Sequence, residues 1–156
     1  MSRGEPGPRL AKPADAEDIG RLLHDFNREY DEPTPEPGRL AERIATLMSA
    51  GDTDILLAGD PPVGVVVLRF REAIWTETPE CYLAELYVVA SERGRGFGRA
   101  LMTAAIDLAR GRGAVVIELG TGEDDLAARS LYESLGFSNR EGRGEGPVNF
   151  YYELEL

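Results

Sequence analysis

Residues 93–99, RGRGFGR, form a dense arginine and glycine segment between two apolar stretches. The run before it, 81–89 (CYLAELYVV), predicts a strand, and the spacing of apolar residues over 97–110 predicts a helix. A helix that begins at such a turn points unpaired backbone N–H groups and partial positive charge outward. Glycines allow an anion to approach those donors closely. The segment therefore predicts an anion-binding turn.

Three phosphate-bearing ligands compete for such a turn. A Walker A loop, GxxxxGK[ST], is disfavoured because no lysine follows these glycines. The dinucleotide fingerprint GxGxxG also fails, since Gly94, Gly96 and Gly98 are spaced GxGxG and lie in the middle of the chain. The pyrophosphate of coenzyme A suits the same turn, and Arg93 completes the pattern R/Q-x-x-G-x-G/A. Coenzyme A is therefore the expected ligand.

Hydrophobic periodicity and turn residues predict the order strand, two helices, three strands, helix, strand, helix, two strands. This order predicts an α/β fold, a mixed and mostly antiparallel sheet of about seven strands flanked by about four helices. The strands are expected at 10–12, 54–58, 63–70, 81–89, 114–119 (a buried strand), near Phe137 and at 148–155, and the helices at about 18–26, from 39 onward, at 97–110 and at 124–135.

Composition and charge constrain the expected domain organisation, location and ligands. Residues 1–8, rich in Gly, Pro and charge, predict a disordered leader before a single domain at 9–156. Lone Cys81 suits a reducing compartment, no apolar run reaches membrane-spanning length, and cytoplasm is the expected location. The net charge of −11 repels nucleic acid and favours cationic small molecules. One histidine, His24, and one cysteine give no metal-site spacing, so no metal is expected.

Two segments resemble motifs of the GNAT superfamily of N-acetyltransferases. Residues 84–110, AELYVVASERGRGFGRALMTAAIDLAR, resemble its acetyl-CoA-binding motif, and 125–137, DLAARSLYESLGF, resemble its NxxARxLYExxGF helix. The predicted element order matches that family's fold over nearly the whole chain. The resemblance implies an enzyme that moves an acetyl group from acetyl-CoA to a primary amine of a small molecule, by direct attack in a ternary complex. It also implies a homodimer.

The resemblance further implies roles for individual residues. Tyr132 would protonate the departing thiolate, although a packed aromatic is the alternative. Glu85, the one charge in its apolar strand, would act as general base or, with equal weight, as a structural partner of an arginine or a backbone donor. Asp125 stands where the family prefers asparagine, and its charge opposes nearby phosphates. The expected cofactor-binding residues are Leu86, Tyr87, Val88, Arg93, Gly94, Arg95, Gly96, Phe97, Gly98, Arg99 and Asp125.

The sequence says least about the identity of the acetyl acceptor. Glu29 and the acidic loop 31–38, with Tyr30 between them, and Trp75 with Glu77 farther along the chain suggest an ammonium-binding pocket, although a solvated acidic loop is common and is the slightly favoured explanation. Two alternative functions stay open. One is a protein or peptide N-acetyltransferase, and the other is a non-catalytic acyl-CoA-binding module, which the Asp125 departure favours.

Overall fold

The structure is a computed structural model that describes residues 6–156. Most of the predicted leader, residues 1–5, lies outside the described residues. The described chain divides into two compact units, one ending at Glu118 and one running from Leu119 to Leu156. The single domain at 9–156 stays a prediction.

The first unit contains a five-stranded sheet in the order β1-β2-β3-β4-β5. All neighbouring strands pair antiparallel except β4 and β5, which are parallel. The predicted pair of helices and the predicted hairpin are both confirmed. The elements are β1 (Arg9–Leu10), α1 (Ala16–Glu29), α2 (Pro37–Ser49), β2 (Thr53–Ala58), β3 (Gly64–Glu72), β4 (Pro79–Val88), α3 (Phe97–Gly111) and β5 (Ile117–Glu118), with 3-10 turns at Pro13–Asp15 and Ala90–Glu92.

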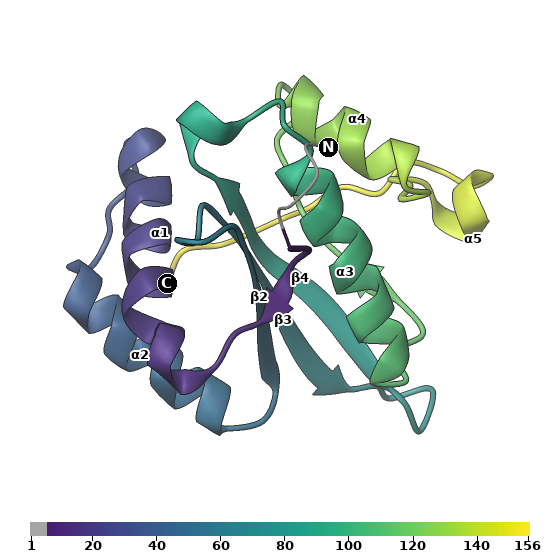
Figure 1. The fold of residues 1–156 in the computed structure, drawn as a ribbon. Helices are drawn as coiled ribbons and strands as arrows, with labels where there is room; N and C mark the ends of the chain where they lie inside the picture. The colour runs from purple at the N-terminus through teal and green to yellow at the C-terminus, as the bar shows by residue number, and fades with distance from the viewer. Residues whose placement is uncertain (1–5) are drawn as a thin grey trace. The chain divides into compact units, whose positions relative to one another are not determined.

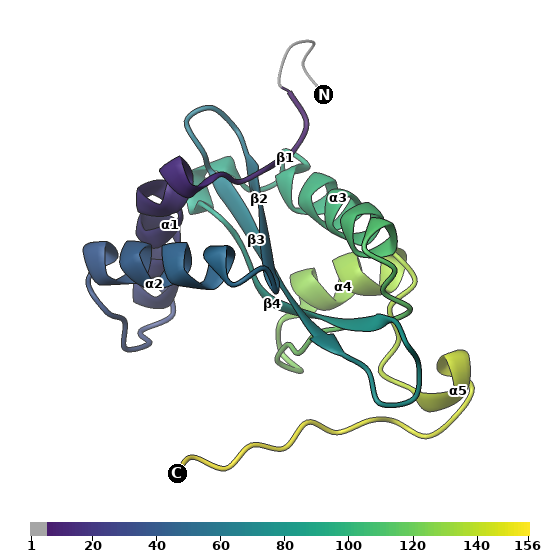
Figure 2. The ribbon, with the colours of Figure 1, turned by 90° about the horizontal axis from the view of Figure 1, so that it is seen from below.

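Helices cover both faces of this sheet, α1 and α2 on one side and α3 on the other (Figures 1 and 2). Alternation along each strand explains the two cores, because successive side chains point to opposite faces. Ile55 and Val67 belong to the cluster that packs against Ile19 of α1. Residues one position away face α3, and a Cβ added to Gly64 would lie only 2.9 Å from the Leu101 side chain. The mixed α/β layering predicted from the sequence is confirmed.

Strand β4 is irregular in two ways. Its pairing with β3 steps from Val67↔Glu85 to Leu68↔Leu83, so Ala84 is an extra residue in a β-bulge. Its pairing with β5 is limited to Cys81↔Ile117 and Tyr82↔Glu118. Beyond Tyr82, no strand within residues 6–118 pairs with that edge of β4. The far half of β4 therefore keeps a backbone edge available to an extended ligand.

The second unit contains α4 (Leu126–Ser134) and the short α5 (Glu141–Gly144). The predicted strands near Phe137 and at 148–155 do not form, and a single bridge, Arg140↔Val148, is the strand-like pairing in this unit. Phe150 and Tyr152 are exposed. Alternating apolar residues show that a segment is able to pair, but a strand also needs an edge that accepts its hydrogen bonds. The described sheet therefore has five strands instead of about seven.

The predicted buried strand at 114–119 is also corrected. Only Ile117 and Glu118 pair, while Val115 and Val116 are 67% and 42% exposed. β-branched residues favour extended backbone, but their burial depends on what covers them.

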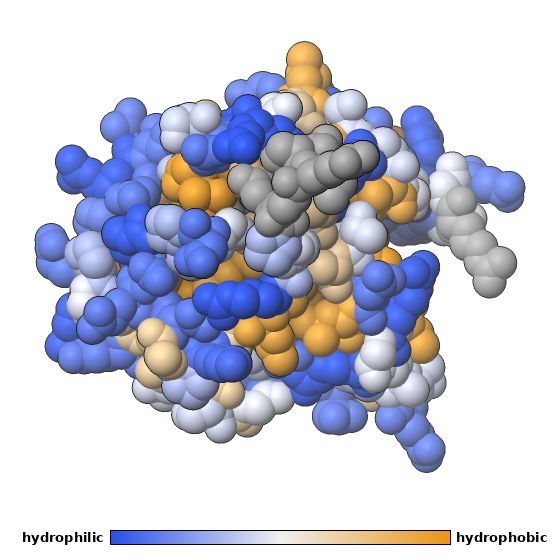
Figure 3. All heavy atoms as spheres, in the orientation of Figure 1, coloured by the Kyte–Doolittle hydropathy of each residue, from blue (hydrophilic) through white to orange (hydrophobic). Residues whose placement is uncertain are grey.

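Hydrophilic side chains dominate the outer surface of α1 and α2, on the left of Figure 3. Glu17, Asp25 and Arg28 are exposed there, while Ile19 and Leu22 are fully buried. Within residues 6–156, no helix combines the length and the apolar character that crossing a bilayer requires.

Candidate active site

The turn at the start of α3 has the backbone that the sequence predicts. Gly96 is the N-cap with φ of 90°, and Gly94 has φ of 79°, both in the left-handed region that favours glycine. The Ala100 N–H donates the first helical bond to the Gly96 carbonyl at 3.0 Å, and a helix leaves the N–H groups before that bond without an intrahelical acceptor. A Cβ on either glycine would meet no atom within 4 Å. An anion such as a pyrophosphate fits this open, donor-lined turn.

The arginines around the turn differ in their contacts. Arg93 donates through Nε to the Val88 carbonyl at 3.0 Å and through Nη2 to both oxygens of Glu29, at 2.9 and 2.7 Å. Arg95 pairs with Glu92, and its guanidinium lies 5.5 Å from the centre of the Phe97 ring. Arg93 therefore fastens the turn to α1 and to the end of β4. Arg99 is exposed on the first turn of α3.

The end of β4 combines structural side chains with an available backbone edge. Tyr87 is buried, its ring centre lies 5.0 Å from that of Phe26, and its hydroxyl donates to Glu29 at 3.2 Å. Burial, and secondly the charge of Glu29, raise the pKa of this phenol. Leu86 and Val88 pair with Val66 and Gly64, which places them on the α3 face. A ligand would therefore meet the backbone of this segment at its strand edge.

Glu85 lies on the sheet face that α1 and α2 cover, because it pairs with Val67. Its side chain is half-buried, and burial alone raises the pKa of its carboxyl group. Within residues 6–156, the structure gives no arginine and no backbone donor to this carboxylate. A carboxylate without a partner and with a raised pKa is suited to accepting a proton near neutral pH.

In the second unit, Asp125 is the N-cap of α4, and its Oδ1 accepts a hydrogen bond from the Ala128 N–H at 3.1 Å. Asparagine and aspartate cap helices about equally well, which accounts for aspartate at a position where the family prefers asparagine. Tyr132, on the same helix, is half-buried, with its ring centre 6.0 Å from that of Phe137. Burial first, and the charge of Asp125 second, raise the pKa of Tyr132, so its phenol is a proton donor at neutral pH.

The acidic loop and Trp75 do not come together. Glu29 at the end of α1 reaches Arg93, just after β4, whereas Trp75 lies in the turn before β4 and is 92% exposed. The ten residues of β4 span roughly 30 Å between these ends. The loop is instead tied to α1, because His24 Nδ1 lies 3.0 Å from the Pro35 carbonyl oxygen and the Asn27 amide donates to the Pro33 carbonyl at 3.1 Å.

Sequence reasoning missed the role of Glu29, which it placed only in the acidic region beside the loop. The residue is 64 positions from Arg93, and no periodicity connects them. A carboxylate in the last turn of α1, where cations are the favoured neighbours, was the one available signal.

Cys81 is almost fully buried, and burial raises the pKa of its thiol to about 11. A thiol with that pKa stays protonated at neutral pH, so it is a poor nucleophile. Among the described residues, no group of three or more His, Cys, Asp or Glu side chains is placed to hold a metal ion.

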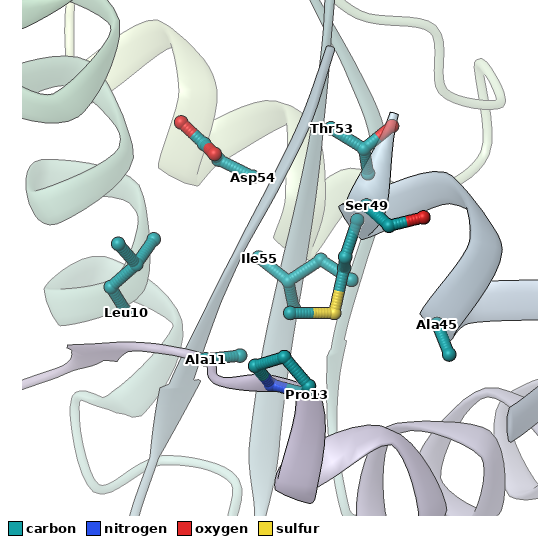
Figure 4. A pocket seen from close by; sticks show the side chains of 9 residues that line it. Leu10, Ala11, Pro13, Ala45, Ser49, Thr53, Asp54 and Ile55 are labelled. Atoms are coloured by element: carbon teal, nitrogen blue, oxygen red, sulfur yellow. The ribbon is translucent and has the colours of Figure 1, made fainter. Parts of the chain in front are cut away.

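A pocket of about 280 Å³ lies where the end of α2 approaches β1 and the start of β2 (Figure 4). None of the predicted site residues lines it, and Asp54 at its rim is bound by Arg112 at 2.9 Å. Its lining therefore offers no unpaired acid or base. The lining residues are Leu10, Ala11, Pro13, Ala45, Met48, Ser49, Thr53, Asp54 and Ile55.

Comparison with known proteins finds relatives that cover most of this chain. The sequence profile described as the acetyltransferase (GNAT) family matches residues 19–137. A mycothiol acetyltransferase of Gordonia bronchialis is 31% identical over 149 residues, covering 88% of this chain and 47% of that protein. A mycothiol acetyltransferase of Thermobispora bispora is 35% identical over 124 residues, covering 74% of this chain and 35% of that protein. The chain thus spans less than half the length of either relative.

A solved structure from Arthrobacter sp. FB24, given the provisional description of an acetyltransferase, matches with a TM-score of 0.88 at 42% identity. The match covers 100% of this chain and 99% of that one. Acetyltransferases of this family use acetyl-CoA as cosubstrate, which agrees with the open glycine turn before α3. The profile match and the two long alignments identify this chain as a member of the GNAT acetyltransferase family.

Proposed function

We propose that this protein transfers the acetyl group of acetyl-CoA to a primary amine of a small molecule, by direct attack within a ternary complex. The observation that carries the proposal is the open turn at Gly94 and Gly96, adjacent to the unpaired edge of β4. These two features suit the two polar parts of coenzyme A, its pyrophosphate and its amide-containing pantetheine arm.

The cosubstrate would be held mainly by backbone. N–H groups from Gly96 to Arg99 would contact the pyrophosphate, with Arg95 and Arg99 supplying charge around it. The backbone of Leu86, Tyr87 and Val88 would pair with the pantetheine amides along the strand edge. Arg93 would act through the position of the turn, because its guanidinium is already bonded to Glu29 and the Val88 carbonyl.

The chemistry needs one proton acceptor and one proton donor. An amine arrives largely as ammonium, and the Glu85 carboxylate would accept its proton, directly or through water. The neutral amine would then form the C–N bond to the acetyl carbon while the C–S bond breaks. Tyr132 would donate its phenolic proton to the departing thiolate sulfur, and the cationic amide nitrogen would lose its second proton to solvent, from which Tyr132 regains one. The raised pKa of Glu85 supports its role as base, and the raised pKa of Tyr132 keeps its phenol protonated until the thiolate forms.

The names of the two bacterial relatives support a small-molecule acceptor, since both are called mycothiol acetyltransferases. We propose a cytoplasmic location, which the buried, unpaired Cys81 thiol supports.

The test is a panel of amines with acetyl-CoA, followed by free-thiol release and by mass spectrometry of the N-acetylated product. Thiol release that depends on added amine is the expected result, with a reaction lacking amine as the control for hydrolysis. Binding of acetyl-CoA without amine-dependent thiol release from any amine would favour the non-catalytic module instead.

A further inference from the structure

Arg69 of β3 carries a buried nitrogen that nothing in the protein satisfies. Its Nε is buried and has no hydrogen-bond partner among residues 6–156, and no ion pair to its guanidinium is described there. The residue as a whole keeps partial exposure. A buried charged donor without a partner is costly, which marks the position as a binding-site candidate.

Three other carboxylates, on or next to the strands that flank β3, already accept hydrogen bonds. Glu80 accepts from Arg71 at 2.6 Å. Asp54 is bound by Arg112 at 2.9 Å, and Asp52 accepts from the Thr53 hydroxyl at 3.1 Å. Of the arginines in this region, Arg71 and Arg112 thus have carboxylate partners, whereas none of these three carboxylates pairs with Arg69.

Arg69 and Glu85 occupy the same face of adjacent strands. Glu85 pairs with Val67, and Arg69 lies two residues farther along β3, opposite Tyr82. Such diagonal neighbours lie roughly 7–8 Å apart, within reach of long side chains. Glu85, like Arg69, forms no ion pair among residues 6–156, and burial raises the pKa of Glu85. The two opposite charges thus share one face of the sheet without forming a direct ion pair.

We propose that Arg69 binds a carboxylate of the acceptor. Because the amine of the acceptor would lie near Glu85, the acceptor would be an amino-acid-like molecule that carries both groups. The proposal rests on the proposed function only in assigning the amine to Glu85. A planar guanidinium binds carboxylate with paired hydrogen bonds. One arginine matches one negative charge, whereas a phosphate would bring about two charges into a protein whose net charge is −11.

The experiment measures binding and transfer separately. Short-chain amino acids of increasing length, each paired with its carboxamide, are titrated into the protein by calorimetry with CoA present, and the same compounds are assayed for thiol release with acetyl-CoA. We expect at least one amino acid to bind about tenfold or more tighter than its amide, a usual effect of losing a charge-assisted pair. The Arg69→Gln variant should remove this preference without changing the KM for acetyl-CoA.

The control is Arg71→Gln, on the same strand, because that arginine is exposed and already paired with Glu80. It should leave the preference intact, and Arg69→Lys should keep part of it because the charge remains. If Arg69→Gln fails to fold, the wild-type comparison of acid with amide and the Arg69→Lys variant still decide the matter.

Equal binding of acid and amide, with transfer to amines intact, would overturn the role of Arg69 and leave the proposed function standing. A carboxylate preference without thiol release from any amine would support the Arg69 site and overturn the proposed function. Preference for an aminoalkyl phosphate over the matched amino acid would overturn the carboxylate assignment. Neither binding nor transfer would overturn both.

Discussion

The Arg93 guanidinium holds the Glu29 carboxylate through two hydrogen bonds, at 2.9 and 2.7 Å, and so joins the last turn of α1 to the turn before α3. The same carboxylate accepts the Tyr87 hydroxyl at 3.2 Å. One acidic residue therefore connects the strand, the glycine turn and the first helix. The loop that follows α1 begins at the residue after Glu29, so the start of that loop lies near the glycine turn.

Replacing Glu29 with Gln should loosen the turn and weaken acetyl-CoA binding more than catalysis. Both side chains are partly exposed, and such pairs contribute about 0.2–1 kcal/mol, so the KM for acetyl-CoA should rise by up to about fivefold with kcat nearly unchanged. Steady-state kinetics measures both constants. Asp18→Asn, which breaks an exposed pair with Arg21 on the same helix, is the matched control and should change neither.

Replacing Glu85 with Gln should lower kcat/KM on the order of a hundredfold, because the base is lost while the shape is kept. Burial raises the pKa of Glu85. The wild-type rate should therefore fall with decreasing pH, as the base becomes protonated, at a higher pH than an ordinary glutamate would give. The pH profile of the variant should lack this fall. Glu80→Gln on the same strand is the control, and an identical profile for Glu85→Gln and wild type would exclude the base role.

Replacing Tyr132 with Phe should lower kcat on the order of a hundredfold and leave acetyl-CoA affinity almost unchanged, because only the proton donor is removed. Single-turnover kinetics and calorimetry separate the two effects. Phe137→Leu tests the alternative in which Tyr132 only packs against its aromatic neighbour. If both variants reduce stability equally and Tyr132→Phe turns over normally, packing is its whole role.

Stability should depend on pH through Asp15. Its hydrogen bond from Arg9, and secondly that from the Lys12 N–H, hold the pKa of Asp15 at about 2, below the ordinary 3.8. The unfolded chain then binds more protons than the folded chain between these values, so the stabilisation is complete above about pH 4 and is lost as the pH falls towards about 2.

Asp15→Asn should therefore destabilise the protein by about 0.5–1 kcal/mol at neutral pH. The difference in unfolding free energy from wild type should vanish as the pH approaches about 2. Denaturant unfolding at a series of pH values measures it. Asp107→Asn, which removes an exposed partner of Arg110, should show no such trend. A difference that is constant with pH would contradict the role given to the Arg9 pair.

The parts of the fold that local patterns determine were predicted from the sequence. The third long helix was expected at 97–110 and runs from Phe97 to Gly111, because apolar spacing and the flanking glycines act within a few residues. Glu85 stood out for a similar reason, as one charge in an apolar strand. Features that depend on pairing between strands distant in the sequence were not predicted from local patterns.

The last two predicted strands show most directly what a local sequence pattern cannot specify. Residues 148–155 alternate as a strand does, yet only Val148 forms a bridge, because alternation does not specify a partner edge. The β4 bulge at Ala84 and the unsatisfied Arg69 were hidden for the same reason. Both depend on the register between β3 and β4, which no local pattern encodes.

If the turn before α3 holds the pyrophosphate of acetyl-CoA, a side chain that fills the turn should block binding, and calorimetry on two glycine variants measures this. Gly96→Val fills the open space over the turn, whereas Gly113→Val, at a similar positive φ of 84° and equally open, lies just beyond the other end of α3. Both variants should carry a similar backbone cost, of about 1–2 kcal/mol. Acetyl-CoA binding should be lost in Gly96→Val and kept in Gly113→Val, whereas equal binding by both variants would show that the turn does not hold the pyrophosphate.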